Sequence, residues 1–147
     1  AEMLYRRTVA AWEKILGPEH PEVATNLNNL GMLYHAQVNY RDAEPLFQRA
    51  LAIREKALGP EHLDVATSLN NLALVYQAQG KYADAEPLYK RSLEILEKAA
   101  GPPQRVATVL ANYAALLKKT GRGTEAKEMK ARAKTIREKH ARANRRR

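Results

Sequence analysis

The feature that most constrains this chain is an internal repeat with a period of 42 residues. Residues 1–42 and 43–84 are identical at 24 of 42 aligned positions, and residues 85–125 match the second copy at 19 positions if a one-residue gap is placed beside Gln104. Residues 126–140 begin a fourth copy. A fixed period of this size is typical of solenoids, in which each unit buries its apolar face only against its neighbours.

Apolar residues recur at helical spacing within each unit. In the second unit, the inward face of a helix expected from about Asp64 to Gln79 is formed by Val65, Leu69, Leu72, Ala73 and Tyr76. Gly80 is expected to end this helix. Asp84 is expected to cap a second helix, with Pro87 in the first turn, where a missing N–H costs little.

Gly-Pro pairs at 17–18, 59–60 and 101–102 divide the chain further. They predict a repeat domain over residues 1–140. This domain would contain an unpaired helix at 1–16 and helix pairs at 22–58, 64–100 and 104–140, followed by a frayed basic tail at 141–147. The predicted fold class is therefore all-α, a solenoid of antiparallel helix pairs.

Composition excludes several classes of protein. The chain has no cysteine, which removes disulfides, thiolate metal sites and thiol nucleophiles. Charges interrupt the apolar residues of the N-terminal segment, so it does not resemble a signal peptide, and no apolar run is long enough to span a bilayer. We therefore expect a soluble, cytoplasmic protein with no membrane partner.

The formal net charge of +9 is concentrated at one end of the chain. Residues 127–147 contain ten lysines and arginines but only two glutamates, so this segment carries +8 and the other 126 residues only +1. The nearly neutral charge of residues 1–126 and the strongly positive charge of residues 127–147 therefore need separate explanations. Because no aromatic residues alternate with these cations and no nucleic-acid motif is present, a solubilising terminal helix or a truncated continuation is favoured over nucleic-acid binding.

Several repeated features resemble the tetratricopeptide pattern. Small residues stand at Gly31, Ala73 and Ala114, where two helices must touch, and alanine opens each second helix. The 42-residue unit, the segment LGPEHPEVAT and the LNNL motif resemble the kinesin light chain class and its bacterial relatives in particular. This resemblance implies a right-handed superhelix that binds a peptide segment of a partner in a concave groove, without a cofactor.

The resemblance also identifies candidate groove residues, on a second face of each first-type helix. The complete set is Thr25, Asn28, Asn29, Met32, His35, Thr67, Asn70, Asn71, Leu74, Gln77, Asn112, Lys118 and Lys119. An asparagine amide has two donors and an acceptor that match the backbone of an extended peptide. Alternatively, one asparagine of each pair bonds to a neighbouring helix backbone and stabilises the stack. The third unit has Ala111 in place of the first asparagine, so this chemistry fades toward the C-terminus.

No catalytic or metal-binding residues are predicted. His20 and His62 recur in the GPEH segments, but they stand one repeat apart without a cluster of carboxylates or histidines, so we expect a turn or helix-capping role. The sequence contains no catalytic triad order, no glycine-rich phosphate loop and no H-E-x-x-H run. We therefore expect a binding protein and not an enzyme.

Two alternatives to peptide binding remain open. The first helix lacks a preceding partner, so Leu4, Val9, Trp12 and Ile15 are expected to lose half of their burial, and the chain is expected to be an excerpt of a longer array or to self-associate through this helix. The basic C-terminus is a possible electrostatic adaptor for nucleic acid. The sequence does not reproduce the lysine- and asparagine-rich clamp by which some relatives hold chaperone carboxylates, because Thr108 and Ala115 stand where a charge or an amide would help, so that partner is not predicted.

Overall fold

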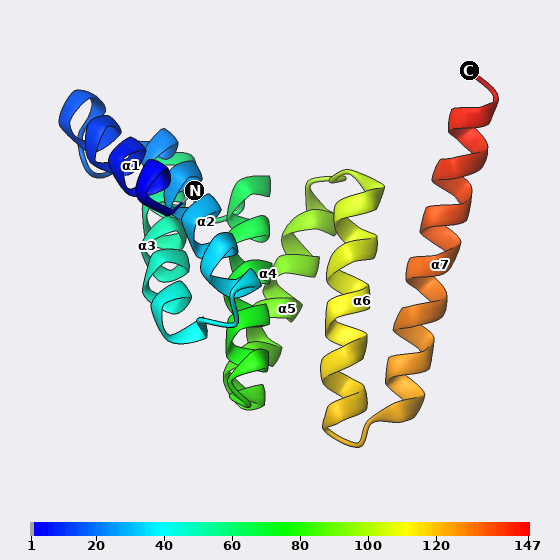
Figure 1. Cartoon of the computed structure of the whole chain (residues 1–147). Coiled ribbons are helices and arrows are strands. Elements are labelled where there is room, and N and C mark those ends of the chain that lie inside the picture. The colour runs from blue at the N-terminus through cyan, green and yellow to red at the C-terminus, as the bar shows by residue number, and fades with distance from the viewer. Residues whose placement is uncertain (1) are drawn as a thin grey trace.

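The computed structural model describes residues 2–147, which form seven α-helices and no strand (Figure 1). The helices are α1 (Glu2–Leu16), α2 (Pro21–Ala36), α3 (Tyr40–Leu58), α4 (Leu63–Ala78), α5 (Tyr82–Lys98), α6 (Pro103–Lys119) and α7 (Gly123–Arg145). Ala1 lies outside the described residues, so the helix expected at 1–16 is seen from Glu2.

The helices pack in the order in which they occur along the chain. The pairs α2–α3, α4–α5 and α6–α7 are joined by short turns, and α1 packs against α2, α3 against α4 and α5 against α6. Figure 1 shows the resulting row of helices from α1 at one end to α7 at the other. This arrangement confirms the predicted all-α solenoid.

Glycines with positive φ form the turns. Gly80 and Gly121 follow α4 and α6 with φ of 78°, in the left-handed region that an L-residue with a Cβ rarely adopts. At the equivalent position after α2, the chain has Val38 with φ of 62°. The first pair therefore contains a strained β-branched residue where the other two pairs have glycine.

Histidines cap the first helices of two pairs. The Nδ1 atom of His20 accepts a hydrogen bond from the Glu22 backbone N–H at 3.1 Å, and His62 accepts one from Asp64 at 3.0 Å. The expected capping role of these residues is therefore confirmed. In contrast, the N-cap of α5 is Lys81 and not Asp84, because the helix begins at Tyr82 and leaves Asp84 in its first turn.

The C-terminal helix is longer than expected. Its helical structure continues to Arg145, so the prediction of a frayed tail from residue 141 was wrong for residues 141–145. No glycine or proline occurs after Gly123, and the alanines, lysines and arginines of this segment are good helix formers. Within residues 2–147, none of the seven helices is long and apolar enough to cross a membrane.

The core lies between the two helices of each pair and between successive pairs. Gly31 illustrates how closely α2 and α3 approach, since a Cβ atom at this position would lie 2.8 Å from Cε1 of Phe47. In α1, Val9 is buried and Trp12 packs beside it on α2 and α3. The expected loss of burial applies to Leu4 and Ile15, which are 68% and 72% exposed.

Candidate functional site

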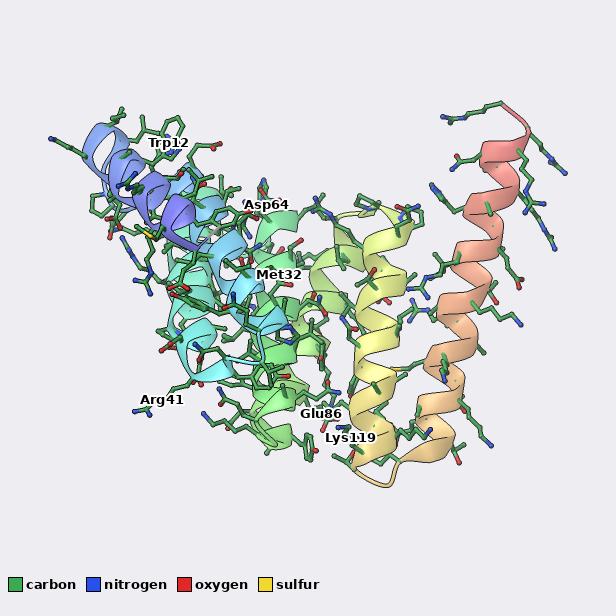
Figure 2. The ribbon with its side chains drawn as sticks, in the orientation of Figure 1. Trp12, Met32, Arg41, Asp64, Glu86 and Lys119 are labelled. Atoms are coloured by element: carbon green, nitrogen blue, oxygen red, sulfur yellow. The ribbon has the colours of Figure 1, made fainter. Side chains whose placement is uncertain are left out.

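The predicted groove residues lie on α2, α4 and α6, but they differ in how accessible they are. Asn70 and Asn71 are buried, while Thr25, Asn29, Met32, Lys118 and Lys119 are exposed, and the remaining six are half-buried. Figure 2 shows Met32 on α2 and Lys119 at the far end of α6. The predicted set is therefore a row of positions on three helices and not one enclosed cavity.

Four asparagines are paired across successive repeats. Nδ2 of Asn71 donates to Oδ1 of Asn28 at 2.7 Å, and Nδ2 of Asn112 donates to Oδ1 of Asn70 at 3.1 Å. We call these two hydrogen bonds the asparagine relay. In each, the second asparagine of one repeat binds the first asparagine of the repeat before it. The relay supports the stabilising alternative, but the partner is another side chain and not the helix backbone.

Other members of the predicted set are also held within the chain. Oε1 of Gln77 accepts a hydrogen bond from the Tyr89 hydroxyl at 2.8 Å. The ring of His35 lies 5.2 Å from that of Tyr40, and burial lowers the pKa of His35. The hydroxyl of Thr67 donates to the backbone of its own helix. Each of these side chains therefore makes a contact within the chain.

A pocket of about 380 Å³ lies between α4 and α6 and contains part of the predicted face. Its polar lining consists of Thr67, Asn70, Asn71, Gln104, Arg105 and Thr108, and its apolar lining consists of Ala66, Leu96 and Val109. We call it the α4–α6 pocket. Sequence reasoning missed Gln104 and Arg105, which lie in the first turn of α6 next to the one-residue gap of the third unit. This one-residue gap, where the third unit departs from the repeat, was the sequence signal that could have identified the two residues.

Arg105 lines this pocket, and a second arginine outside the lining, Arg54, shares its neighbour Asp64. Arg105 lies 3.7 Å from Oδ1 of Asp64, and the buried Arg54 donates to the Ser68 hydroxyl at 2.8 Å and to the Asp64 backbone carbonyl at 3.4 Å. Burial lowers the pKa of Arg54, and the negative charge of Asp64 opposes that effect. The pocket therefore combines amide and hydroxyl groups with one arginine, whose charge Asp64 partly offsets.

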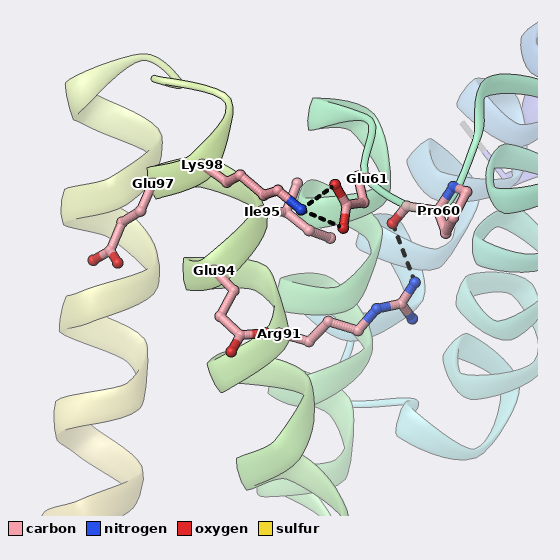
Figure 3. Close-up of a pocket in the computed structure, with 7 residues that line it drawn as sticks. All are labelled: Pro60, Glu61, Arg91, Glu94, Ile95, Glu97 and Lys98. Carbon is pink, nitrogen blue, oxygen red and sulfur yellow. Dashed lines mark hydrogen bonds and ion pairs between the residues drawn. The ribbon is translucent and has the colours of Figure 1, made fainter.

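A larger pocket, of about 760 Å³, opens between the loop before α4 and the helix α5 (Figure 3). Its cations are already paired: Lys98 binds Glu61 at 2.9 Å, and Arg91 binds Glu55 at 3.2 Å and donates to the Pro60 carbonyl at 3.2 Å. One repeat earlier, a smaller pocket is lined by the residues 42 positions before six of these lining residues. We therefore interpret both pockets as products of the way the repeats stack.

The same ion pairs recur along the array. Arg49, Arg91 and Arg132 on the second helices bind Glu13, Glu55 and Glu97 on the preceding second helices, respectively. Because these partners are 35 or 36 residues apart, each pair connects two repeats. Exposed pairs of this kind contribute little energy individually, but together they fix the stacking of neighbouring units.

Comparisons with known proteins agree with this geometry. The tetratricopeptide repeat family matches residues 1–56 and 27–98. No curated protein matches the chain. The fold is similar to that of BtubC (BKLC) from P. vanneervenii, with a TM-score of 0.85 and 24% identity over 95% of this chain and 56% of that one.

Two further structures share the fold. A kinesin light chain protein with nearly identical TPR-like repeats from Podosopora anserina has a TM-score of 0.72 and 26% identity, over 95% of this chain and 66% of that one. The N-terminal domain of stress-induced protein-1 from C. elegans has a TM-score of 0.61 and 17% identity, over 79% of this chain and 85% of that one. The present chain thus spans less than two thirds of the first two proteins. It belongs to the tetratricopeptide repeat family, and its repeats are of the kinesin light chain-like class.

Proposed function

We propose that this chain is a non-catalytic scaffold that binds an extended segment of a partner protein along α2, α4 and α6, with the α4–α6 pocket at the centre of the contact. Tetratricopeptide repeats are generally protein–protein interaction modules, and arrays of this kind use an extended inner surface for binding. The partner's identity is set by side chains on this surface, so the family alone does not define it.

The composition of the α4–α6 pocket carries the proposal. The relay uses Oδ1 of Asn70 and Nδ2 of Asn71. Within residues 2–147, the other amide atom of each side chain, Nδ2 of Asn70 and Oδ1 of Asn71, has no hydrogen-bond partner. Two residues that line the pocket therefore keep one amide donor and one amide acceptor outside the relay, the two kinds of group that an extended backbone pairs with. The cation of Arg105 at the edge favours an acidic residue in the bound segment.

The relay determines how the proposal has to be tested. Replacing Asn28 and Asn70 together removes both relay acceptors. A loss of binding in that double variant would therefore be explained equally well by lost peptide contacts and by disturbed stacking of the repeats. Thr108→Arg is cleaner, because Thr108 is exposed, lines the pocket and takes no part in the relay. Thr135→Arg is the matched control, since Thr135 is an exposed helical threonine that donates to the carbonyl four residues earlier, as Thr108 does, but lies on α7 and outside the pocket.

The experiment selects peptides from a random 12-residue display library on the wild-type protein and measures their affinity by fluorescence anisotropy. We expect Thr108→Arg to weaken binding of the selected peptides at least tenfold and Thr135→Arg to change their affinity less than twofold. Asn112→Ala breaks one relay hydrogen bond but removes no side chain that lines the pocket. The change in peptide affinity in this variant therefore measures how much a disturbed relay alone affects binding. Equal affinity for the wild type and Thr108→Arg would refute binding at the α4–α6 pocket.

Self-association through α1 is the second candidate, because Met3, Leu4 and Ile15 are 71%, 68% and 72% exposed. Trp12 already packs on α2 and α3 within its own chain, so its fluorescence is a poor reporter of association. Sedimentation at several concentrations is the direct measurement. We expect Leu4→Glu with Ile15→Glu to shift any oligomer toward monomer, and a wild type that is monomeric at all concentrations would exclude this candidate.

A further inference from the structure

The groove between α6 and α7 has the form of a helix-binding site, but its chemistry differs from that of the contacts between repeats. Two neighbouring pockets of about 490 and 410 Å³ share Ala111 and Lys130. Alanines from both helices form the floor, and four cations, Lys118, Lys127, Lys134 and Arg137, stand around it together with Lys130. We call this surface the α6–α7 groove.

Comparison with the preceding repeats shows what such a groove holds. Lys130 occupies the position of Tyr89 in α5 and of Phe47 in α3. Tyr89 stacks on Tyr113 of α6 with ring centroids 5.7 Å apart, and Phe47 belongs to an apolar cluster that includes Leu72 of α4. This position therefore faces the next helix in each earlier repeat. The α6–α7 groove is the corresponding surface of the last pair, with lysine in place of the aromatic ring.

The cations of this groove carry charge that the chain does not neutralise. Within residues 2–147, none of Lys118, Lys127, Lys130, Lys134 and Arg137 forms an ion pair, whereas Arg132 of the same helix binds Glu97. Glu138 is the one acidic residue that lines the two pockets. The four α7 cations are spaced by 3, 4 and 3 residues, so they form one stripe along the helix.

We propose that the α6–α7 groove docks an acidic amphipathic helix of a partner protein. The alanine floor accepts a helix at close approach, as small residues do wherever two helices touch, and the cation stripe binds Asp or Glu residues on the flanks of the incoming helix. From residue 126 to residue 141 the groove is about 22 Å long at 1.5 Å per residue, which matches a helix of about 15 residues.

Charge also distinguishes this partner from a second copy of the chain. The exposed helix α1 carries Arg6, Arg7 and Lys14 against Glu2 and Glu13, so docking it on the groove would bring cations toward cations. An acidic helix has the complementary charge and an apolar face of the required shape. This inference is independent of peptide binding at the α4–α6 pocket, because the two surfaces share no lining residue.

The test uses a fluorescein-labelled 16-residue helical peptide with an alanine and leucine stripe flanked by glutamates. A scrambled peptide of the same composition and a 20-base-pair DNA duplex serve as competing probes. We expect the patterned peptide to bind the full chain at least tenfold tighter than the scrambled one, with an affinity that falls as salt is raised. Failure of the patterned peptide to bind, or equal binding of both peptides, would overturn the proposal.

Three variants separate the groove from general basicity. Lys130→Glu with Lys134→Glu should weaken the patterned peptide at least tenfold, whereas Lys139→Glu with Arg142→Glu, which makes the same change of net charge outside the two pockets, should weaken it less than threefold. Ala115→Trp keeps every charge but fills the groove, and it should also reduce binding at least tenfold.

Each variant is first checked by circular dichroism for wild-type helicity. Equal losses in the two charge-reversal variants, or full binding by Ala115→Trp, would show that attraction is nonspecific and that no helix occupies the groove. DNA binding that depends on the same lysines, without binding of the patterned peptide, would assign the surface to nucleic acid and refute the proposal.

Discussion

Replacing Glu86 tests whether a three-donor cluster holds the third repeat on the second. Oε1 of Glu86, near the start of α5, accepts a hydrogen bond from the Tyr113 hydroxyl at 2.7 Å and pairs with Arg122 at 2.6 Å and Lys90 at 3.3 Å. Glu86 lies beside the ends of α5 and α6 in Figure 2. The Tyr113 hydrogen bond is the main cause that lowers the pKa of Glu86 to about 2, and the two cations add to it.

The magnitude follows from this pKa. A carboxyl group whose pKa falls from 4.5 to about 2 on folding contributes at most about 3 kcal/mol to the free energy of unfolding at neutral pH. The side chain of Glu86 is 24% exposed and that of Lys90 is 59% exposed, so solvent screens part of the attraction. We therefore expect Glu86→Gln to lower the free energy of unfolding by about 1–2 kcal/mol at pH 7.

The sign of the pH dependence provides a second check. Because folding lowers the pKa of Glu86, its contribution is complete above pH 4.5 and is lost as the pH falls toward 2. Glutamine does not titrate, so the difference between the wild type and Glu86→Gln should shrink to near zero at pH 2. The measurement is urea unfolding followed by circular dichroism at pH 7, 4.5, 3 and 2.

Two further variants control this measurement. Glu94→Gln changes an exposed acid on the same helix that has no ion pair within residues 2–147, so it should alter stability by less than about 0.5 kcal/mol. Tyr113→Phe, combined with Glu86→Gln in a double-mutant cycle, should give a coupling energy of about 1 kcal/mol. A Glu86→Gln defect of equal size at pH 7 and pH 2, or a coupling energy near zero, would refute the role assigned to the ionised cluster.

The turn after α2 and the N-cap of α4 give two further predictions, both measured by thermal unfolding. Val38→Gly should stabilise the chain by about 0.5–1 kcal/mol, because it removes left-handed strain at a residue that is 68% exposed and stands where the later repeats have glycine; no gain in midpoint temperature would contradict this. His62→Ala should cost about 1 kcal/mol, because the Asp64 N–H loses its cap; an unchanged midpoint would remove the capping role.

Most of the fold was predictable from the sequence because each structural boundary has a local cause. Gly-Pro pairs and glycines at the turns fixed the helix pairs to within a few residues, and the 42-residue period predicted that the pairs stack. The two differences also have local causes. Asp84 is a good capping residue, but α5 starts at Tyr82, and a segment without glycine or proline continues α7 to Arg145.

The pairing of the candidate site residues was not predictable in the same way. Periodicity identifies equivalent positions, yet the relay joins non-equivalent ones, such as Asn28 with Asn71, which are 43 residues apart. That difference depends on how far one helix is displaced along its neighbour, which is set by the packing of whole side chains. The α4–α6 pocket likewise depends on the one-residue gap in the third unit, beside which Gln104 and Arg105 of α6 enter the lining.

The change of chemistry at α6–α7 follows from these same positions and explains why we expect a separate partner there. Asn70 accepts the relay hydrogen bond from the next repeat, but its equivalent in α6 is Ala111, which has no acceptor. Tyr89 provides the aromatic contact to the next repeat, but its equivalent in α7 is Lys130. A helix docked on this face would therefore be held by ion pairs over an alanine floor. Because salt weakens such contacts, the attachment should be reversible, unlike the packing between the repeats themselves.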